Sequence, residues 1–217
     1  MKTDELISNL ASTLTPVRRL KPPGVRMLFW LLISTLYVGL GITFFGVRAD
    51  FRTKLLDAQF LLDTVAILAV SIASAGTAFY LSVPGRKEDG RLSRIVWLSA
   101  AFWTAYFVLS MFIQSAHQGS LDMNAGAGRL CVESIFELGI VPAVCIFIMI
   151  RKAAPLELGK AGAFSMLAAV ALAGFATQWI CQYDFPLHFL VWHVLPITTL
   201  SVLGIVLGKR FFRRPGR

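Results

Sequence analysis

The chain has 217 residues, of which 56% are hydrophobic and only 15% are charged. Roughly a quarter of the residues of soluble domains are charged, so this composition excludes an ordinary soluble protein and indicates an integral membrane protein. The formal net charge of +9 would suit a nucleic-acid-binding protein, but basic residues must first be assigned to the two sides of the membrane.

The segment from Met1 to Pro23 is the only long polar stretch of the chain. Helical spacing places four of its apolar side chains within an arc of about 80°: Leu6, Ile7, Leu10 and Leu14. This pattern predicts an amphipathic helix of about three turns, with Thr3 as its N-cap. Asp4 and Glu5 stand in the first turn, where they favour the positive end of the helix dipole.

A helix this short must bury its apolar stripe to be stable. Three surfaces can cover the stripe: a partner protein, the membrane bundle of the same chain, or the lipid surface. Helices on a lipid surface carry Lys and Arg on the polar face, whereas here two acids come first and a basic cluster follows the helix: Arg18, Arg19, Lys21 and Arg26. The pattern favours docking to a partner protein.

Six apolar runs of about 20 residues follow, each long enough to cross about 30 Å of hydrocarbon as a helix. They lie at 27–47, 61–83, 95–113, 130–150, 161–180 and 188–208. We assign residues 1–23 to a polar segment and residues 24–217 to a six-helix transmembrane domain. The predicted fold is an all-α integral membrane protein with six transmembrane helices and a short amphipathic N-terminal helix.

Basic residues are divided unequally between the two sides of these spans. Of the 21 Lys and Arg residues, 17 fall on the side of the chain termini and 4 on the other side. By the positive-inside rule, both termini and the N-terminal helix are predicted to be cytoplasmic. Topology and lipid headgroups account for the net charge, so no direct contact with nucleic acid is predicted.

Two spans carry features that indicate packing. Trp30, near the start of the first span, is predicted to anchor that helix at the cytoplasmic interface. In the second span, small residues form a stripe that lets a neighbouring helix approach closely: Ser71, Ser74, Ala75 and Ala78.

The fourth span contains two carboxyl groups, Glu133 and Glu137, four residues apart and therefore on one helix face. An intramembrane carboxylate is a candidate functional group, although Arg129 can pair with Glu133. Glu137 falls at the same depth as His193 of the sixth span. This polar layer either binds an ion or only holds the helices in register. Pro142 and Pro196 are predicted to kink the fourth and sixth helices.

Three cysteines are present, with no CxxC motif, so no zinc ribbon or thioredoxin-type site is predicted. Cys131 begins the fourth span and Cys181 ends the fifth, which places both at the outer membrane edge, the oxidising side in a Gram-negative cell. The two thiols can form a disulfide, bind a soft metal, or lie on opposite sides of the bundle.

A metal held by these thiols would need further ligands, for which His117, His188 and Glu133 are the candidates. Such binding would be transient, and no permanent cofactor is predicted. No Walker loop, GxSxG or HExxH motif occurs, and the cytoplasmic loops are short. An enzyme is therefore not predicted.

Four features together carry a resemblance: the opening MKTDELI, the TPVRRLKPP before the first span, the VPGR after the second span, and the cysteine pair. They resemble the NrsF-type family, negative regulators of an extracytoplasmic-function sigma factor. The resemblance extends over the whole chain, including the six spans.

The resemblance implies a membrane-bound anti-sigma factor of the bacterial inner membrane. Such a protein holds its sigma factor through the N-terminal segment and releases it on an envelope stress signal. On this chain, the resemblance implies that Asp4, Glu5 and Leu6 belong to the sigma-contacting segment and that Cys131 and Cys181 sense the signal.

A competing interpretation is a small transporter or ion-binding membrane protein that uses Glu133, Glu137 and His193. Inverted repeats would support it, but residues 1–94 and 95–217 show no convincing repeat.

Overall fold

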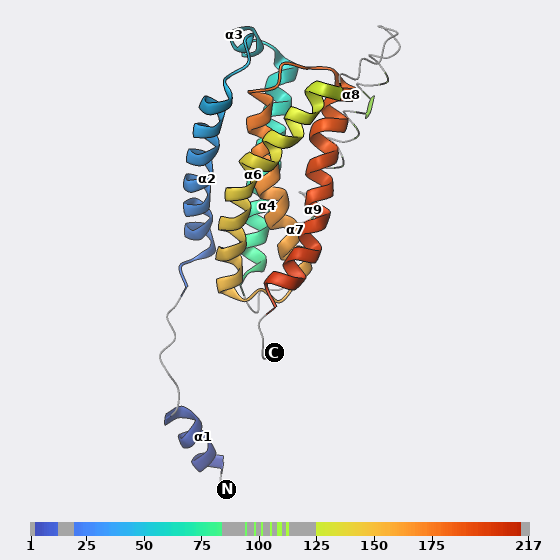
Figure 1. The fold of residues 1–217 in the computed structure, drawn as a ribbon. Helices are drawn as coiled ribbons and strands as arrows, with labels where there is room; N and C mark the ends of the chain where they lie inside the picture. Colours follow the sequence, from blue (N-terminus) through green and yellow to red (C-terminus); the bar gives the residue numbers. More distant parts are fainter. Residues whose placement is uncertain are drawn as a thin grey trace.

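The computed structural model describes residues 3–12, 20–83 and 125–213, together with seven single residues between 94 and 112. Within these residues the secondary structure is entirely helical. The elements in chain order are α1 (Thr3–Ser12), α2 (Pro23–Phe45), α3 (Phe51–Lys54), α4 (Ala58–Leu81), α6 (Ala125–Ala153), α7 (Leu158–Gln178), α8 (Pro186–Phe189), the π-helical turn η1 (Leu190–Val194) and α9 (Leu195–Phe211) (Figure 1).

Five helical stretches of the described chain are long and apolar enough to cross a membrane. They are Pro23–Phe45, Ala58–Leu81, Gly128–Ala153, Leu158–Gln178 and Pro186–Phe211. These correspond to the first, second, fourth, fifth and sixth predicted runs, and each begins a few residues early. Pro23 and Pro186 explain two of the early starts, since proline fits the first helical turn, where its missing N–H costs no hydrogen bond.

The third predicted span, 95–113, lies outside the described residues except at six single positions. Those positions, at 98, 101, 105, 108, 109 and 112, are helical. In the N-terminal segment, Thr3 is the first residue of α1 instead of its N-cap, and α1 ends at Ser12.

Helix α7 lies at the centre of the bundle and packs against α4, α6 and α9. The predicted small-residue stripe of α4 is buried, and Ser71 Oγ donates a 2.7 Å hydrogen bond to the carbonyl of Ala168 on α7. On the α9 side, a Cβ on Gly162 would collide with the carbonyl oxygen of Gly204. Small residues therefore let both neighbours approach α7 closely.

Helix α2 is bound to α6 by hydrogen bonds from side chains to backbone. Trp30 Nε1 donates to the carbonyl of Pro142 at 2.9 Å, and Tyr37 Oη donates to the carbonyl of Glu137 at 2.8 Å. The Arg26 guanidinium also donates to the carbonyl of Met149. Trp30 is completely buried, so its predicted role as an interfacial anchor is wrong: its indole N–H finds an acceptor inside the bundle.

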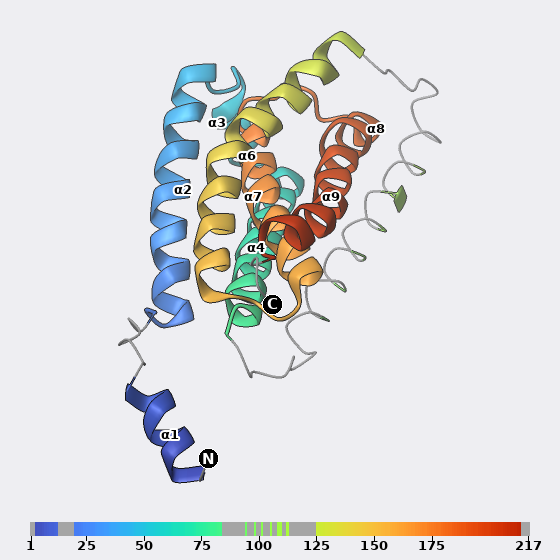
Figure 2. The same ribbon diagram turned by 60° about the horizontal axis from the view of Figure 1, so that its bottom comes forward.

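The bundle has two distinct ends (Figures 1 and 2). At one end, which we call the basic end, lie the start of α2 and the last turns of α6 and α9. Those last turns carry Arg151, Lys152, Lys209 and Arg210. At the other end, which we call the cysteine end, lie α3, the start of α6 and α8 (Figure 1).

Candidate thiol and imidazole site

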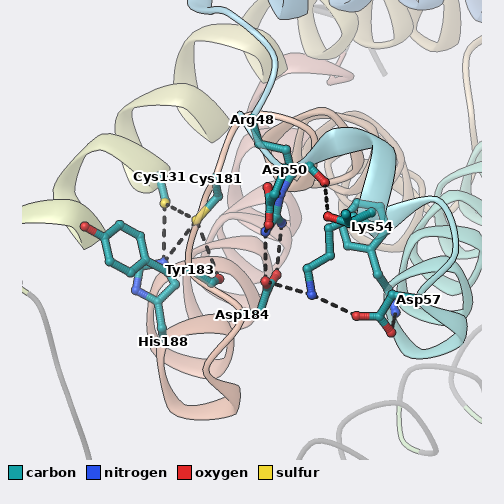
Figure 3. Close-up of polar contacts among 11 residues, drawn as sticks. Arg48, Asp50, Lys54, Asp57, Cys131, Cys181, Tyr183, Asp184 and His188 are labelled. Carbon is teal, nitrogen blue, oxygen red and sulfur yellow. Dashed lines mark hydrogen bonds and ion pairs between the residues drawn. The ribbon is translucent and has the colours of Figure 1, made fainter.

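Two cysteines and two histidines meet at the cysteine end, and Figure 3 shows Cys131, Cys181 and His188 of this set. Cys131 Sγ lies 3.3 Å from Cys181 Sγ. His188 Nε2 lies 3.5 Å from the first sulfur and 3.4 Å from the second. With His193 included, one ligand atom from each of the four residues lies within 4.8 Å of the others. We call these four residues the thiol–imidazole group.

Three segments of the chain supply this group: the start of α6, the residues that follow α7, and the continuous helical run of α8 and η1. Cys131 lies near the start of α6, where Gly128 faces the ring of Trp192, and a Cβ at Gly128 would collide with that ring. The glycine therefore lets α6 approach η1 closely. Cys181 follows α7, and its backbone N–H donates a 2.8 Å hydrogen bond to the carbonyl of Thr177.

The two histidines share a face because the helix that carries them contains a π turn. A regular α-helix would place His188 and His193, five residues apart, about 140° apart around the axis. The structure has a π turn at Leu190–Val194, which bonds residues five apart and so brings His193 toward the face of His188. Pro196 favours this wider turn because it has no N–H for the carbonyl four residues earlier and crowds that carbonyl.

All four members of the group are buried, and His188 and His193 are each only 1% exposed. Neither ring nitrogen of His193 has a hydrogen-bond partner among the described residues. The His193 ring stacks on Phe189 with its centroid 4.7 Å away. Unpaired buried polar atoms are costly, so His193 is a group that a ligand or water would satisfy.

The two thiols differ in their surroundings. Cys181 accepts the hydrogen bond from the Cys131 thiol and also contacts His188, and these interactions lower the pKa of the Cys181 thiol. Chemically, the group can form a disulfide or coordinate a soft cation.

A cluster of ion pairs adjoins the thiol–imidazole group at the same end of the bundle (Figure 3). The Arg48 side chain is only 1% exposed and donates to Asp50 at 2.6 Å and to Asp184 at 2.8 Å. Lys54 extends the cluster to Asp57 at 2.8 Å. We call these five residues the Arg48 cluster.

Hydrogen bonding sets the charge states in the Arg48 cluster. Burial disfavours the charged form of Arg48, but its hydrogen bonds to Asp50 and Asp184 outweigh burial and raise the pKa of Arg48. The hydrogen bond from Arg48 lowers the pKa of Asp50, and the hydrogen bond from Lys54 lowers the pKa of Asp57. These hydrogen bonds favour the charged forms of Arg48, Asp50 and Asp57.

A cavity of about 230 Å³ connects the two groups, since residues of both line it. Its lining includes Asp57 and Asp184 of the Arg48 cluster and Cys181 and His193 of the thiol–imidazole group. Asp63 also lines it, and the Asp63 Oδ1 atom is buried without a hydrogen-bond partner among the described residues. The cavity is polar and large enough for several water molecules.

The structure separates the residues that the sequence proposed as metal ligands or as a polar layer. His188 and His193 lie with the cysteines. Glu133 is nearly half exposed and pairs with Arg129 at 2.7 Å. Glu137 is exposed, so neither glutamate joins the thiol–imidazole group. His117 lies outside the described residues.

The side chains of the proposed partner-binding helix are exposed. Leu6 is 42% exposed and Ile7 is 59% exposed, and Asp4 and Glu5 are exposed as well. The side chain of Leu10, and Leu14 as a whole, lie outside the described part of the chain. The described part of the predicted stripe, Leu6 and Ile7, is therefore exposed.

Sequence reasoning did not find the Arg48 cluster or the joint position of the two histidines. The residues of the Arg48–Asp184 pair are 136 positions apart, and no local pattern connects them. The alternation of charges between Arg48 and Asp57 was the available signal. That signal could be interpreted only with the knowledge that Asp184, which follows α7, lies at the same end of the bundle.

The fold and the site together define a class of protein: an all-helical chain with five described helices of membrane-spanning length and a buried group of two cysteines and two histidines at one end. The model of the NrsF family, described as negative regulator of sigma F, matches residues 10–213. The chain belongs to the NrsF family. Comparison with curated proteins and with solved structures gives no match. The family name identifies a negative regulator whose implied partner is a sigma factor, a role that favours regulation over catalysis.

Proposed function

We propose that the protein is a membrane-bound anti-sigma factor of the bacterial inner membrane, with both termini in the cytoplasm. It sequesters an extracytoplasmic-function sigma factor through residues 1–23. It releases the sigma factor on an envelope signal, a thiol-reactive metal or an oxidant, sensed at Cys131 and Cys181. The observation that carries the proposal is the match to a family of sigma-factor negative regulators over residues 10–213.

The surface of α1 supports docking through the N-terminal segment. Leu6 and Ile7 are exposed large apolar residues on a short helix, and such a helix gains stability by laying its apolar face in a groove. Asp4 and Glu5 in its first turn add charge for recognition. In this proposal Leu10 and Leu14 continue the contact stripe.

The charge distribution supports the proposed orientation. The basic end of the bundle carries basic last turns on α6 and α9, as the cytoplasmic side of a membrane protein does. The cysteine end then faces the oxidising side, where thiols meet oxidants and metals from outside the cell.

The contacts between α6 and α2 support a route for the signal. Helix α6 carries Cys131 near its start and is hydrogen-bonded to α2 at Glu137, Pro142 and Met149. Helix α2 follows directly after the sigma-contacting segment. Closure of the thiol pair moves the start of α6 relative to the end of α7. The hydrogen bonds from α2 side chains to α6 carbonyls carry this movement to α2.

Co-purification tests the proposal. The full chain, expressed with its candidate sigma factor and extracted from membranes, is expected to retain the sigma factor, whereas a variant lacking residues 1–15 is expected to lose it. Leu6→Glu provides a point variant, and Ser8→Glu, on the opposite side of the same helix, provides a matched control that retains the partner. Retention by the deletion variant would overturn the assignment of the binding segment.

A further inference from the structure

We infer that Cys131, Cys181, His188 and His193 form a closed four-ligand site for a divalent cation of the Zn²⁺ type. This inference deepens the proposed signal sensing, since it names the ligand set and the cation class. Metal binding does not require a sigma factor, so the site can be tested even if the proposed partner is wrong.

The distances are close to those of a tetrahedral ion. Zn–S bonds of about 2.3 Å and Zn–N bonds of about 2.0 Å give tetrahedral edges of roughly 3.8 Å between two sulfurs and roughly 3.5 Å between a sulfur and a nitrogen. His188 Nε2 lies 3.5 and 3.4 Å from the two sulfurs, which matches the sulfur–nitrogen edge. The two sulfurs are 3.3 Å apart and would separate by about 0.5 Å on binding the ion. His193 supplies a fourth ligand atom within 4.8 Å of the others, so small side-chain movements complete the tetrahedron.

Burial and charge also fit this ion. Two thiolates neutralise a divalent cation, and neutral imidazoles add ligands without adding charge, so a loaded site adds no net charge to the bundle. Both nitrogens of His193 lack hydrogen-bond partners among the described residues, and a metal bond would satisfy one of them. With four protein ligands the site keeps no open position, which is typical of structural zinc and not of catalytic zinc.

The adjoining cavity gives the ion a route and the ligands a second layer of contacts. The cavity is lined by Asp57, Asp63 and Asp184 together with Cys181 and His193. A cation that enters the cavity therefore passes carboxyl groups on its way to the site. Metal-bound histidines commonly hydrogen-bond a carboxylate or water through their second nitrogen. Water in the cavity can serve His193 and the unpaired oxygen of Asp63 together.

Metal titration of the purified full chain, reduced and metal-free in lipid nanodiscs, tests the inference. We expect one Zn²⁺ per chain in competition with a chromophoric chelator. Co²⁺, used as a spectroscopic probe, should give thiolate charge-transfer bands and the intense visible bands of a tetrahedral ion. A weak octahedral Co²⁺ spectrum, or no stoichiometric binding by the unmodified chain, would overturn the inference without reference to any variant.

Variants distinguish this ligand set from a site built on the thiols alone. His188→Gln and His193→Gln should each lower Zn²⁺ affinity by at least about 100-fold, while both variants still form the Cys131–Cys181 disulfide on oxidation. Cys145→Ser and Glu133→Gln are matched controls that should bind as the unmodified chain does. Unchanged affinity in both histidine variants would refute the four-ligand site.

A final variant separates the failure of this inference from failure of the proposed function. Deletion of residues 1–15 should leave Zn²⁺ binding unchanged and abolish retention of the sigma factor. Loss of Zn²⁺ binding on that deletion would contradict a site built only from the bundle.

Discussion

The cysteine end of the bundle and helix α1 differ in which kind of side chain they bury and which they expose. At the cysteine end, groups that normally face water are buried: Arg48 and both histidines of the thiol–imidazole group. On α1, groups that normally avoid water are exposed, Leu6 and Ile7 among them. Contacts from several elements hold the first region within the chain, whereas Leu6 and Ile7 of the second remain exposed. In the proposed function, the cysteine end receives the signal and α1 binds the sigma factor, so the two roles lie in separate regions of the chain.

The largest expected effect comes from breaking the exposed region. We expect Leu6→Glu or Leu10→Glu to weaken sigma-factor binding by at least about 2 kcal/mol, as loss of a buried interface anchor does. The regulon of the sigma factor would then be on without a signal. Membrane retention of the sigma factor measures the effect, and retention by both glutamate variants would show that the docking helix is misassigned.

The next effect tests the buried region as a sensor. We expect Cys131→Ser and Cys181→Ser, each alone, to blunt the response to thiol-reactive metals while repression without signal stays intact. Closure of the pair must favour one helix arrangement by roughly 1 to 3 kcal/mol to act on a remote partner. A reporter of sigma-factor activity measures the response. If both variants respond as the unmodified chain does, the cysteines are only small apolar residues of the core.

The sequence predicted the five described helices of spanning length because apolar runs of that length carry their own signal. It also predicted features of single helix faces, such as the buried stripe at Ser71 and the pairing of Arg129 with Glu133. Local patterns of this kind need no knowledge of which helices are neighbours. The position of Cys131 and Cys181 at one depth followed from topology, but depth alone left open whether the two thiols meet.

The remaining features depend on contacts between distant segments. Trp30 looked like an interfacial residue because its position near the helix start was known and its acceptor on Pro142 was not. His193 was grouped with Glu137 by depth, whereas a π turn directs it to the cysteines and Glu137 faces outward. Arg48 finds Asp184 only once the bundle brings the ends of α2 and α7 together. Rotation about the helix axis and the choice of neighbours decided these cases.

The Arg48 cluster tests whether the buried region depends on its ion pairs. We expect Arg48→Met to destabilise the cysteine end by about 2 kcal/mol, because hydrogen bonds to two carboxylates are lost. Arg52→Met, at an exposed arginine of α3, is the matched control. Thermal unfolding in detergent measures the difference, and equal melting of the two variants would mean that the buried ion pairs contribute nothing.

A smaller effect concerns the connection between the two regions. Tyr37→Phe removes the hydrogen bond from α2 to the carbonyl of Glu137, which is expected to cost about 1 kcal/mol. The signal concentration for half-maximal release should then rise roughly fivefold, with repression unchanged. Thr35→Val is the control, since the Thr35 hydroxyl donates to the carbonyl of Leu31 in its own helix. Equal dose responses in the two variants would exclude this contact from the route.

The smallest expected effect is the pH dependence of the cysteine end. Asp50 and Asp57 have pKa values lowered below their ordinary value of 3.8 by hydrogen bonds from Arg48 and Lys54. Their contribution to stability is therefore present above that value and is lost as the pH falls through the lowered pKa values. Both carboxylates are partly exposed, at 44% and 36%, so solvent screening keeps the contribution small. Unfolding midpoints between about pH 5 and about pH 3 should fall less in Arg48→Met than in Arg52→Met, because the first variant has already lost the bond that lowers the pKa of Asp50. An equal fall in the two variants would assign the acid sensitivity to other carboxylates.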